Sequence, residues 1–466
     1  MSNTMERLSD VARRIGASLH GTDAAFSRVI TDTRQLQPGD LFVALKGDRF
    51  DGHDYVARAM SLGAVGALVS RIVDGGGAQI LVADTLDGLQ RYAQSWRQDF
   101  DIPVIGITGS SGKTTTKQMV AAVVAARGPV LATVGNLNNH IGVPLTLLSL
   151  RAEHRTAVIE MGASGPGEIA LLARLAQPQI GIVTQAGDAH LEGFGSRAGV
   201  AHAKGELFAA IANNLANQAA GGVAIINADD AYAPLWRQLA GNASVLSFGF
   251  AAEADVRAVD LVGVPEQAPE ATAFTLVAPV GGARIELALP GLHNVQNALS
   301  AAAVGIVLNL GIEQIAKGLA NVTPVAGRLN WKTTREGARL LDDSYNANPS
   351  SLRAALDLLA SLPGQRWLVL GEMRELGADA ASIHEDAGRA ARSLGIDRLY
   401  TLGEMAGHAA DGYGDTANRY EQLDDLVAAL KDRLAEGVTV LVKGSRGARM
   451  ERVVAALTNT AAEAAH

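Results

Sequence analysis

The spacing of apolar residues divides the chain into three stretches, and each shows the alternation of strands and helices that is typical of an α/β fold. In residues 1–100, apolar runs such as "DLFVAL" and "AQILVAD" alternate with helical patterns. A predicted helix near the amino terminus carries four apolar residues on one face: Met5, Leu8, Val11 and Ile15. This first stretch is therefore predicted to form a small α/β domain.

The second stretch, residues 101–323, begins with the apolar run "IPVIGITG" and continues through "TAVIEMG", "IGIVTQAG" and "GVAIINAD". Buried strands that alternate with helices predict a doubly wound, mostly parallel sheet. An Ala-rich insert at 251–289 predicts short antiparallel strands. The third stretch, residues 324–466, repeats the alternation and predicts a Rossmann-like domain. Because no Gly-x-Gly-x-x-Gly follows its strands, the pattern does not support nicotinamide or flavin binding.

A glycine-rich segment, "GITGSSGKTTTK" at residues 106–117, follows the first apolar run of the second stretch. Gly109 and Gly112 lie between a predicted strand and a helix that begins near Lys113. In that setting, backbone N–H groups and the helix dipole converge on phosphate oxygens. The spacing is Gly-x-x-Gly-Lys-Thr-Thr, because Ile107 occupies the position of the first glycine in the common phosphate-loop motif.

This loop predicts a nucleotide site in which Lys113 neutralises the β and γ phosphates and the Thr114 hydroxyl contacts Mg²⁺. A strand-to-helix turn that binds no ligand is the alternative. The loop residues predicted to contact the nucleotide are Gly109, Ser110, Ser111, Gly112, Lys113, Thr114 and Thr115.

Three further polar residues follow predicted strands of the second stretch or lie on its helices. Glu160 ends the strand "TAVIE", at the carboxyl edge where parallel sheets bind ligands, and is predicted to be a Mg²⁺ ligand. A helix cap or a solvated acid is the alternative for Glu160. His190 follows another strand and Lys204 lies in the helical segment "AHAKGELF". Taken alone, an isolated histidine at such a position is more often structural than a ligand, and a helical lysine is usually just solvated.

Composition limits the classes of partner. The formal net charge of -8 argues against a surface for nucleic acid or anionic membranes, so the predicted ligand is a small molecule. The chain has no cysteine, which excludes disulfides and thiolate chemistry. No apolar run reaches the roughly 18 residues that a membrane-spanning helix needs, and the amino terminus lacks the apolar core of a signal peptide. These features predict a cytoplasmic protein without membrane insertion.

The motifs together resemble the Mur ligase family, whose members are ATP-dependent, amide-forming enzymes of peptidoglycan synthesis. The resemblance covers residues 28–453. Its blocks are "TDTRQLQPGDLFVAL", "DGHDY", "GITGSSGKTTTK", "GNLNNHIGVPLTLL", "EMGASGPGEI", "AHLEGFGS", "AKGELF", "GLHNVQNALSAAA", "AGRLNW", "DDSYNANPSS", "LGEMRELG" and "LVKGSRGARME".

The resemblance implies three domains: residues 1–100 recognise a UDP-linked substrate, residues 101–323 bind ATP, and residues 324–466 close over the nucleotide and carry the incoming amine. It also implies that ATP transfers its γ-phosphate to a carboxylate, and that an amine then attacks the acyl phosphate with release of ADP and phosphate. A carboxylate is a poor electrophile, whereas phosphate leaves easily from an acyl phosphate.

The resemblance assigns residues by position. Glu160 and His190 match Mg²⁺ ligands that act with Thr114, and Lys204 matches a lysine that several relatives carry in carbamylated form beside a second Mg²⁺. Carbamylation converts a cation into an anion that two magnesium ions would attract. Lys113, Glu160, His190 and Lys204 are thus the predicted catalytic residues. Further ATP contacts are expected from Asn294, Asn297, Arg328 and Asp343, and substrate contacts from Thr33, Arg34, Asn138, Asn139, Tyr345, Asn346 and Asn348.

Within the family, the block "DDSYNANPSS" resembles the branch that adds D-alanyl-D-alanine to a UDP-N-acetylmuramoyl-tripeptide. The Asp-Asn-Pro-[Arg/Ala] signature of the preceding ligase is absent. A phosphate-loop switch or motor is expected to contain an Asn-Lys-x-Asp motif, which this chain lacks. A sugar or nucleotide kinase would share the phosphate loop but would not need Glu160, His190 and Lys204 together. The protein is expected to be a monomer. His384 is a candidate substrate contact or a structural histidine, and the identity of the third residue of the tripeptide stays open.

Overall fold

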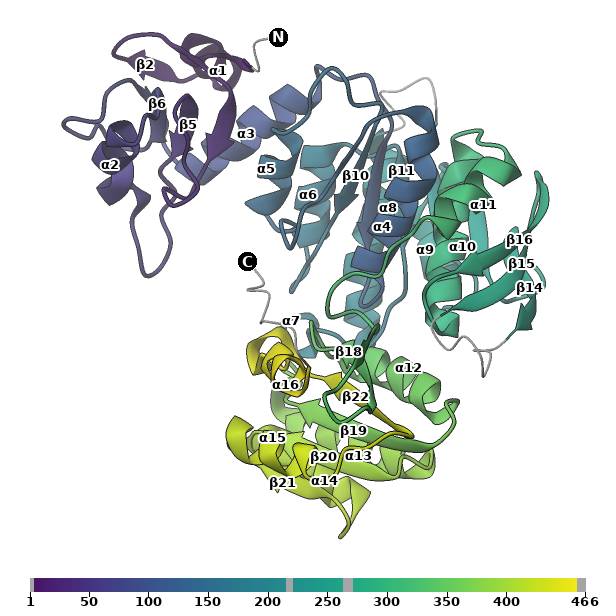
Figure 1. The fold of residues 1–466 in the computed structure, drawn as a ribbon. Helices are drawn as coiled ribbons and strands as arrows, with labels where there is room; N and C mark the ends of the chain where they lie inside the picture. Colours follow the sequence, from purple (N-terminus) through teal and green to yellow (C-terminus); the bar gives the residue numbers. More distant parts are fainter. Residues whose placement is uncertain (1–3, 215–220, 263–270, 459–466) are drawn as a thin grey trace. The chain divides into compact units, whose positions relative to one another are not determined.

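The computed structural model describes residues 4–214, 221–262 and 271–458 (Figure 1). The chain divides into two compact units. The first unit contains Met1–Gly106, Arg127–Gly162 and Glu168–Gln179, and the second contains Ile107–Ala126, Ala163–Gly167 and Ile180–His466. Among the described residues, no helix has both the length and the apolar character needed to cross a bilayer.

The amino-terminal part of the first unit is a five-stranded sheet with helices packed on it (Figure 1). In spatial order the strands are β2 (Ser18–His20), β7 (Gln79–Leu81), β6 (Gly66–Val69), β5 (Asp40–Val43) and β4 (Arg28–Ile30). All neighbours are parallel except β2 and β7. The other elements here are β1 (Glu6–Arg7), α1 (Leu8–Ile15), β3 (Ala25–Phe26), α2 (Val56–Ser61) and α3 (Thr85–Arg97).

Helix α1 confirms most of the predicted amino-terminal helix. Its apolar residues Leu8, Val11 and Ile15 are buried, as their spacing along one face requires. The prediction was wrong for Met5, which precedes the helix and donates its backbone N–H to the carbonyl of Phe26 at 2.8 Å. A backbone bond to a neighbouring strand segment therefore takes the place of a helical turn.

The rest of the first unit contains a parallel strand pair, β9 (Val130–Ala132) and β10 (Thr156–Glu160). Two helices accompany these strands, α5 (Gly142–Leu147) and α6 (Glu168–Ala176). Strand β10 is buried along its whole length, as expected for a parallel strand that is covered on both faces.

The second unit begins with the end of strand β8 (Val104–Thr108) and helix α4 (Lys113–Val124). Strands β11 (Ile180–Val183), β12 (Val223–Asn227), β13 (Ser244–Gly249) and β14 (Val256–Val262) follow one another in parallel. Strands β15 (Thr272–Ala278) and β16 (Gly281–Leu287) then continue the sheet as antiparallel neighbours. Antiparallel strands were predicted for the insert at 251–289 and are confirmed there, although residues 263–270 lie outside the described residues. The helices are α7 (Leu191–Phe194), α8 (Arg197–Asn214), α9 (Ala233–Leu239), α10 (Leu292–Val307) and α11 (Ile312–Ala320).

The carboxyl-terminal part of the second unit is a six-stranded sheet. Its spatial order is β17 (Asn330–Thr333), β18 (Arg339–Asp343), β22 (Val438–Lys443), β19 (Gln365–Gly371), β20 (Arg398–Leu402) and β21 (Asn418–Tyr420). Only β17 is antiparallel to its neighbour. Helices α12 (Pro349–Ala360), α13 (Ala380–Ser393) and α14 (Glu404–Tyr413) contribute to one hydrophobic core, and α15 (Leu423–Lys431) and α16 (Glu451–Leu457) to another. Helices thus cover both faces, and the predicted Rossmann-like architecture is confirmed.

Candidate functional site

The glycine-rich loop has the predicted strand–loop–helix geometry, since β8 ends at Thr108 and α4 begins at Lys113. Both glycines are required. Gly109 has φ 141°, and a Cβ there would lie 1.9 Å from Thr184 Oγ1. Gly112 has φ 82°, and a Cβ there would lie 2.5 Å from Asn297 Oδ1. The first turn of α4 therefore opens directly onto the loop, as in sites that bind phosphate at a helix amino terminus.

Hydrogen bonds fasten this loop to the residues that follow β11. The hydroxyl of Ser110 donates to the carbonyl of Gly187 at 3.0 Å and accepts the Gly187 N–H at 2.9 Å. The Thr184 hydroxyl donates to the Ser111 carbonyl at 2.6 Å. Lys113 Nζ donates to the carbonyl of Gly109 at 2.6 Å, which keeps the ammonium group against the loop. The loop is thus fixed in place, with a positive charge beside it.

One cavity in the second unit brings together loop residues and residues that lie far away in the sequence. Asn294 and Asn297, both buried on α10, line it. The Thr116 hydroxyl donates to Asn297 Oδ1 at 3.2 Å, and Asn297 Nδ2 donates to Asn294 Oδ1 at 3.3 Å. The predicted ATP contacts that line this cavity are Ser111, Gly112, Thr115, Asn294, Asn297, Arg328 and Asp343. Residues predicted separately from distant motifs therefore share one cavity.

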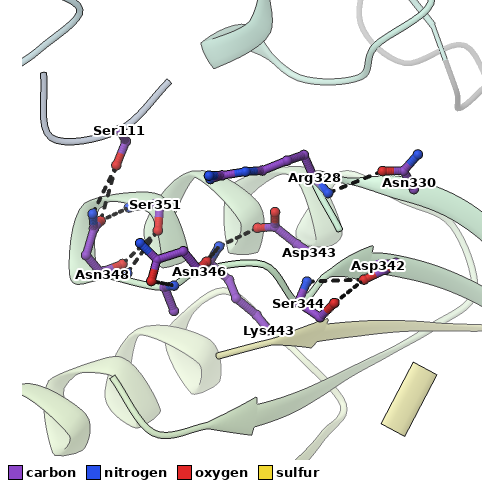
Figure 2. Close-up of polar contacts among 11 residues, drawn as sticks. Ser111, Arg328, Asn330, Asp342, Asp343, Ser344, Asn346, Asn348, Ser351 and Lys443 are labelled. Carbon is purple, nitrogen blue, oxygen red and sulfur yellow. Dashed lines mark hydrogen bonds and ion pairs between the residues drawn. The ribbon is translucent and has the colours of Figure 1, made fainter. Parts of the chain in front are cut away.

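The carboxyl-terminal part of the second unit contributes the charged residues Arg328, Asp343 and Lys443 to this cavity, and Figure 2 shows their contacts. Asp343 forms an ion pair with Lys443, and Lys443 Nζ also donates to the carbonyl of Asn346 at 3.0 Å. The Arg328 guanidinium lies over the ring of Tyr345, 4.3 Å from its centroid. Burial raises the pKa of the Asp343 carboxyl and lowers the pKa of the Lys443 ammonium, while the charge of each partner opposes these shifts.

Two of the ionisable residues that line this cavity, Lys443 and His293, were not predicted from the sequence. Lys443 lies at the carboxyl end of a buried strand in "LVKGSRGARME", and His293 directly precedes Asn294. Burial and the nearby Lys443 charge lower the pKa of His293 to about 4, so this imidazole is neutral at physiological pH. A lysine that ends an otherwise apolar strand was the available signal for Lys443, because charges rarely end buried strands without a partner.

Asn348 uses its side chain in two structural contacts. Its Oδ1 accepts the backbone N–H of Ser351 at 2.8 Å and so caps α12. Its Nδ2 donates to the Ser111 hydroxyl at 3.1 Å, as Figure 2 shows. The segment after β18 therefore touches the phosphate loop through Asn348. Asn346 is the neighbour with an exposed side chain, so of the two it is better placed to meet a substrate.

These two contacts can be separated by mutation. We expect Asn348→Ala to lower the free energy of unfolding by about 1 kcal/mol through loss of the helix cap. Asn348→Asp is the matched control, because an aspartate caps as well as an asparagine but brings a negative charge to the phosphate loop. We therefore expect Asn348→Asp to unfold like the wild type and yet to raise KM for ATP several-fold. Denaturant unfolding measures the loss of the helix cap, and steady-state kinetics measure the effect on ATP binding. Equal KM values for ATP in Asn348→Asp and the wild type would contradict a role for the contact between Asn348 and Ser111.

The predicted metal ligands belong to both units: Glu160 to the first, and Thr114, His190 and Lys204 to the second. In the second unit, His190 has φ 54° and pairs through Nδ1 with Glu375, which has φ 62°. Burial lowers the pKa of His190, and the Glu375 carboxylate opposes this shift. Lys204 is 1% exposed, donates to the carbonyl of Ala163 at 3.1 Å and lies 5.0 Å from the centroid of the Phe194 ring.

In the first unit, Glu160 is buried at the end of β10. Its Oε1 accepts from Asn138 Nδ2 at 2.9 Å, and its backbone N–H donates to the Thr133 hydroxyl at 2.9 Å. The alternative of a solvated acid is therefore excluded for Glu160. Asn139 Oδ1 accepts the backbone N–H of Gly142 at 2.9 Å, so this side chain orders the start of α5.

Within the described ranges, no cluster of three or more His, Asp or Glu side chains is placed to hold a metal ion. The predicted metal ligands include only two residues of these types, Glu160 and His190. The other two predicted ligands are the Thr114 hydroxyl and a carbamylated Lys204. The donor chemistry of the set is suited to Mg²⁺, which prefers oxygen, only when Lys204 is carbamylated.

Two further sets of predicted residues are found in their own surroundings within each unit. Thr33 and Arg34 line a cavity of the first unit, together with Phe50 and Tyr55, which are 58% and 46% exposed. His384 is fully buried, and its Nε2 accepts the backbone N–H of Met373 at 3.0 Å. Of its two alternatives, the structural role is the one that this geometry supports.

The fold and the cavity define a phosphate-loop protein whose nucleotide site is completed by a Rossmann-like carboxyl-terminal part. Three family models match the chain: the Mur ligase middle domain over residues 107–305, the Mur ligase glutamate ligase domain over residues 327–446, and the Mur ligase family catalytic domain over residues 25–79. Each match lies within one of the three domains predicted from the sequence, whose boundaries stay a prediction. The chain belongs to the Mur ligase family.

Similar proteins cover nearly the whole chain. The UDP-N-acetylmuramoyl-tripeptide--D-alanyl-D-alanine ligase of Escherichia coli is 43% identical over 460 residues, which is 98% of each protein. The ligase of the same name from Bacillus subtilis is 36% identical over 97% of this chain and 98% of its own. Among solved structures, MurF from Acinetobacter baumannii has a TM-score of 0.90 at 34% identity and covers 98% of this chain and 99% of its own. MurF from Thermotoga maritima in complex with ADP has a TM-score of 0.80 at 28% identity, with 92% and 96% covered.

Proposed function

We propose that this chain is an ATP-dependent ligase that adds D-alanyl-D-alanine to UDP-N-acetylmuramoyl-tripeptide and releases ADP and phosphate. The observation that carries the proposal is the cavity that the phosphate loop lines together with Asn294, Asn297, Arg328 and Asp343. The relatives that bear this activity in their names match the chain from end to end. The ADP complex of the Thermotoga protein supports ATP as the nucleotide.

The residues of the cavity suit the parts of ATP. The loop and the Lys113 ammonium group offer N–H donors and positive charge to the phosphates, which accumulate negative charge during transfer. The side-chain amides of Asn294 and Asn297 both donate and accept, as an adenine edge requires. The Asp343 carboxylate accepts hydrogen bonds, as ribose hydroxyls require, and the Arg328 guanidinium would attract phosphate oxygens.

Thr114, Glu160, His190 and carbamylated Lys204 would hold Mg²⁺. A magnesium ion bound there would reduce the repulsion between two anions, the phosphates of ATP and the substrate carboxylate that accepts the γ-phosphate. Lys204 is buried against the Phe194 ring, so an unmodified ammonium group there would oppose a metal ion nearby, whereas a carbamate would attract it. We therefore propose that Lys204 is carbamylated and that two Mg²⁺ ions bind.

The remaining assignments concern the two organic substrates. We place the uridine end of the first substrate in the cavity of Thr33 and Arg34, and its peptide near Asn138 and Asn139. Tyr345 and Asn346 are proposed to face D-alanyl-D-alanine, with Asn348 as the link to the phosphate loop. Because ATP and UDP-linked precursors are cytoplasmic, the proposal places the enzyme in the cytoplasm, and monomeric action stays a prediction.

Release of ADP tests this proposal directly. With ATP, Mg²⁺ and UDP-N-acetylmuramoyl-tripeptide present, we expect D-alanyl-D-alanine to drive ADP release, while free D-alanine, L-alanine, D-glutamate, L-lysine and diaminopimelate drive it at least roughly 100-fold more slowly. A pocket built to bind both ends of a dipeptide leaves polar groups unpaired when a single amino acid enters. Faster turnover with a single amino acid and a UDP-linked dipeptide would favour a sibling ligase. Formation of AMP and pyrophosphate would contradict the acyl-phosphate route.

A further inference from the structure

Lys443 is a buried cation in the nucleotide cavity to which the proposed chemistry gives no role. It is the last residue of β22, is 1% exposed and lines the cavity together with Asp343 and Arg328. Burying an ammonium group is costly unless it is paired and hydrogen-bonded. The burial of Lys443 therefore requires interactions that offset this cost.

The strand register gives Lys443 its partner. Strands β18 and β22 are parallel neighbours, and Asp343 and Lys443 are paired residues at the carboxyl ends of both. The two side chains form an ion pair at the edge of the sheet that faces the cavity (Figure 2). A second bond runs from Lys443 Nζ to the carbonyl of Asn346 at 3.0 Å. One lysine thus holds both the Asp343 carboxylate and the backbone of the segment that follows it.

That segment leads to the phosphate loop. Residues 344–348 connect Asp343 to Asn348, whose Nδ2 donates to the Ser111 hydroxyl at 3.1 Å. Lys443 is therefore bonded to this segment at Asn346, two residues before its contact with the loop. A displacement of Asn346 would move Asn348 relative to Ser111, because so short a segment transmits it directly.

The charges around Asp343 show why its partner matters. Lys443 and Arg328 favour the ionised carboxylate, whereas burial and the neighbouring Asp342 oppose it and raise the pKa of Asp343. Asp342 is itself engaged by Lys332 at 3.3 Å and by the Ser344 hydroxyl. His293 lies close enough to Lys443 to feel its charge and is neutral. Among these groups, Lys443 is the cation in direct contact with Asp343.

We propose that Lys443 is a positioning residue for nucleotide binding: it keeps Asp343 anionic and directed into the cavity, and it ties the 344–348 segment to the sheet so that Asn348 reaches the phosphate loop. This inference rests on the proposed function only for the identity of the nucleotide. Apolar residues of similar size often stabilise a fold as well as a buried ion pair does. Stability alone therefore does not account for this pair. An anionic Asp343 accepts two hydroxyl hydrogen bonds, which suits a ribose.

The test measures ADP affinity by calorimetry on the full-length protein, with no peptide substrate present. We expect Lys443→Met, which keeps the length of the side chain, to bind ADP roughly tenfold or more weakly near pH 7, because removing one member of a buried charge pair leaves the other unpaired. Lys443→Arg keeps the charge and should recover a large part of the affinity. The sign of the pH effect follows from Asp343. Without Lys443 its pKa rises further, so ADP affinity of Lys443→Met should increase as the pH is raised from about 6 to about 8, more steeply than in the wild type.

The double variant Lys443→Met/Asp343→Asn separates positioning from structural damage. If Lys443 acts partly through Asp343, this variant should lack the added pH dependence, and removal of Lys443 should cost less ADP affinity in the Asp343→Asn protein than in the wild type; the remaining loss measures the bond to Asn346. If Lys443→Met by itself fails to fold, the double variant, which leaves no buried unpaired charge, should still bind ADP roughly tenfold or more weakly than the wild type, and wild-type affinity in the double variant would overturn the inference. Wild-type affinity in Lys443→Met, or additive losses in the double variant, would overturn the inference. A wild-type protein that binds no ADP would overturn the proposed function as well, so the two failures are distinguishable.

Discussion

Replacing Lys204 by alanine is expected to lower the rate of ADP release by roughly 1,000-fold or more, an effect of the size seen when a group that stabilises transition-state charge is lost. Lys204 is buried, and its Nζ donates to the Ala163 carbonyl at 3.1 Å in the second unit. If it is carbamylated, the substitution removes an anion and leaves a small cavity in its place. Added short-chain carboxylates should enter this space and restore part of the activity.

Lys204→Met is the matched control for this rescue. Methionine fills the same space without a charge, so its turnover should fall as far as that of Lys204→Ala, but added carboxylate should not restore it. Isotopically labelled bicarbonate gives a readout that does not depend on turnover, because the wild type should take up the label at one lysine and both variants should lose it. Near-normal turnover of Lys204→Ala at ordinary bicarbonate concentrations would show that no carbamate is needed.

The parts of the site that the sequence predicted are those determined by local geometry. Gly109 and Gly112 have positive φ angles. A Cβ at Gly109 would collide with Thr184, and a Cβ at Gly112 would collide with Asn297. A short motif therefore contains the information that a strand, a phosphate loop and a helix follow one another. The alternation of apolar and polar runs similarly predicted the strands and helices of both large sheets, because parallel strands are buried on both faces and read as continuous apolar runs.

The parts that could not be predicted depend on pairings between distant segments. Asp343 and Lys443 are 100 residues apart and meet only because β22 is placed beside β18 in the sheet. The partner of His190 is likewise Glu375, from the segment after β19. Asn348 stays a predicted substrate contact, but the bonds of its side chain that cap a helix and reach Ser111 were not predicted. Residue type alone does not distinguish these uses, since an amide serves equally well in each.

Substitution of Lys113 is expected to have an effect as large as that of Lys204, through the loss of a different charge. Its Nζ donates to the Gly109 carbonyl at 2.6 Å, so the ammonium group lies within the loop that would surround the phosphates. During transfer, negative charge spreads over the phosphoryl oxygens, and a fixed cation stabilises that charge more than it stabilises bound ATP. We therefore expect Lys113→Ala to lower kcat by roughly 1,000-fold and kcat/KM for ATP by at least as much.

Lys113→Arg is the control that keeps the charge, and it should retain more activity than Lys113→Ala while falling short of the wild type, because a planar guanidinium does not reproduce the compact ammonium group. Lys113 is only partly buried, so both variants should unfold at nearly the wild-type denaturant concentration. Single-turnover kinetics would locate the loss in phosphoryl transfer when acyl-phosphate formation slows as much as ADP release does. If Lys113→Ala keeps turnover within a few-fold of the wild type while Lys204→Ala does not, the phosphates are not bound by this loop. The glycines that shape it would then have only a structural role.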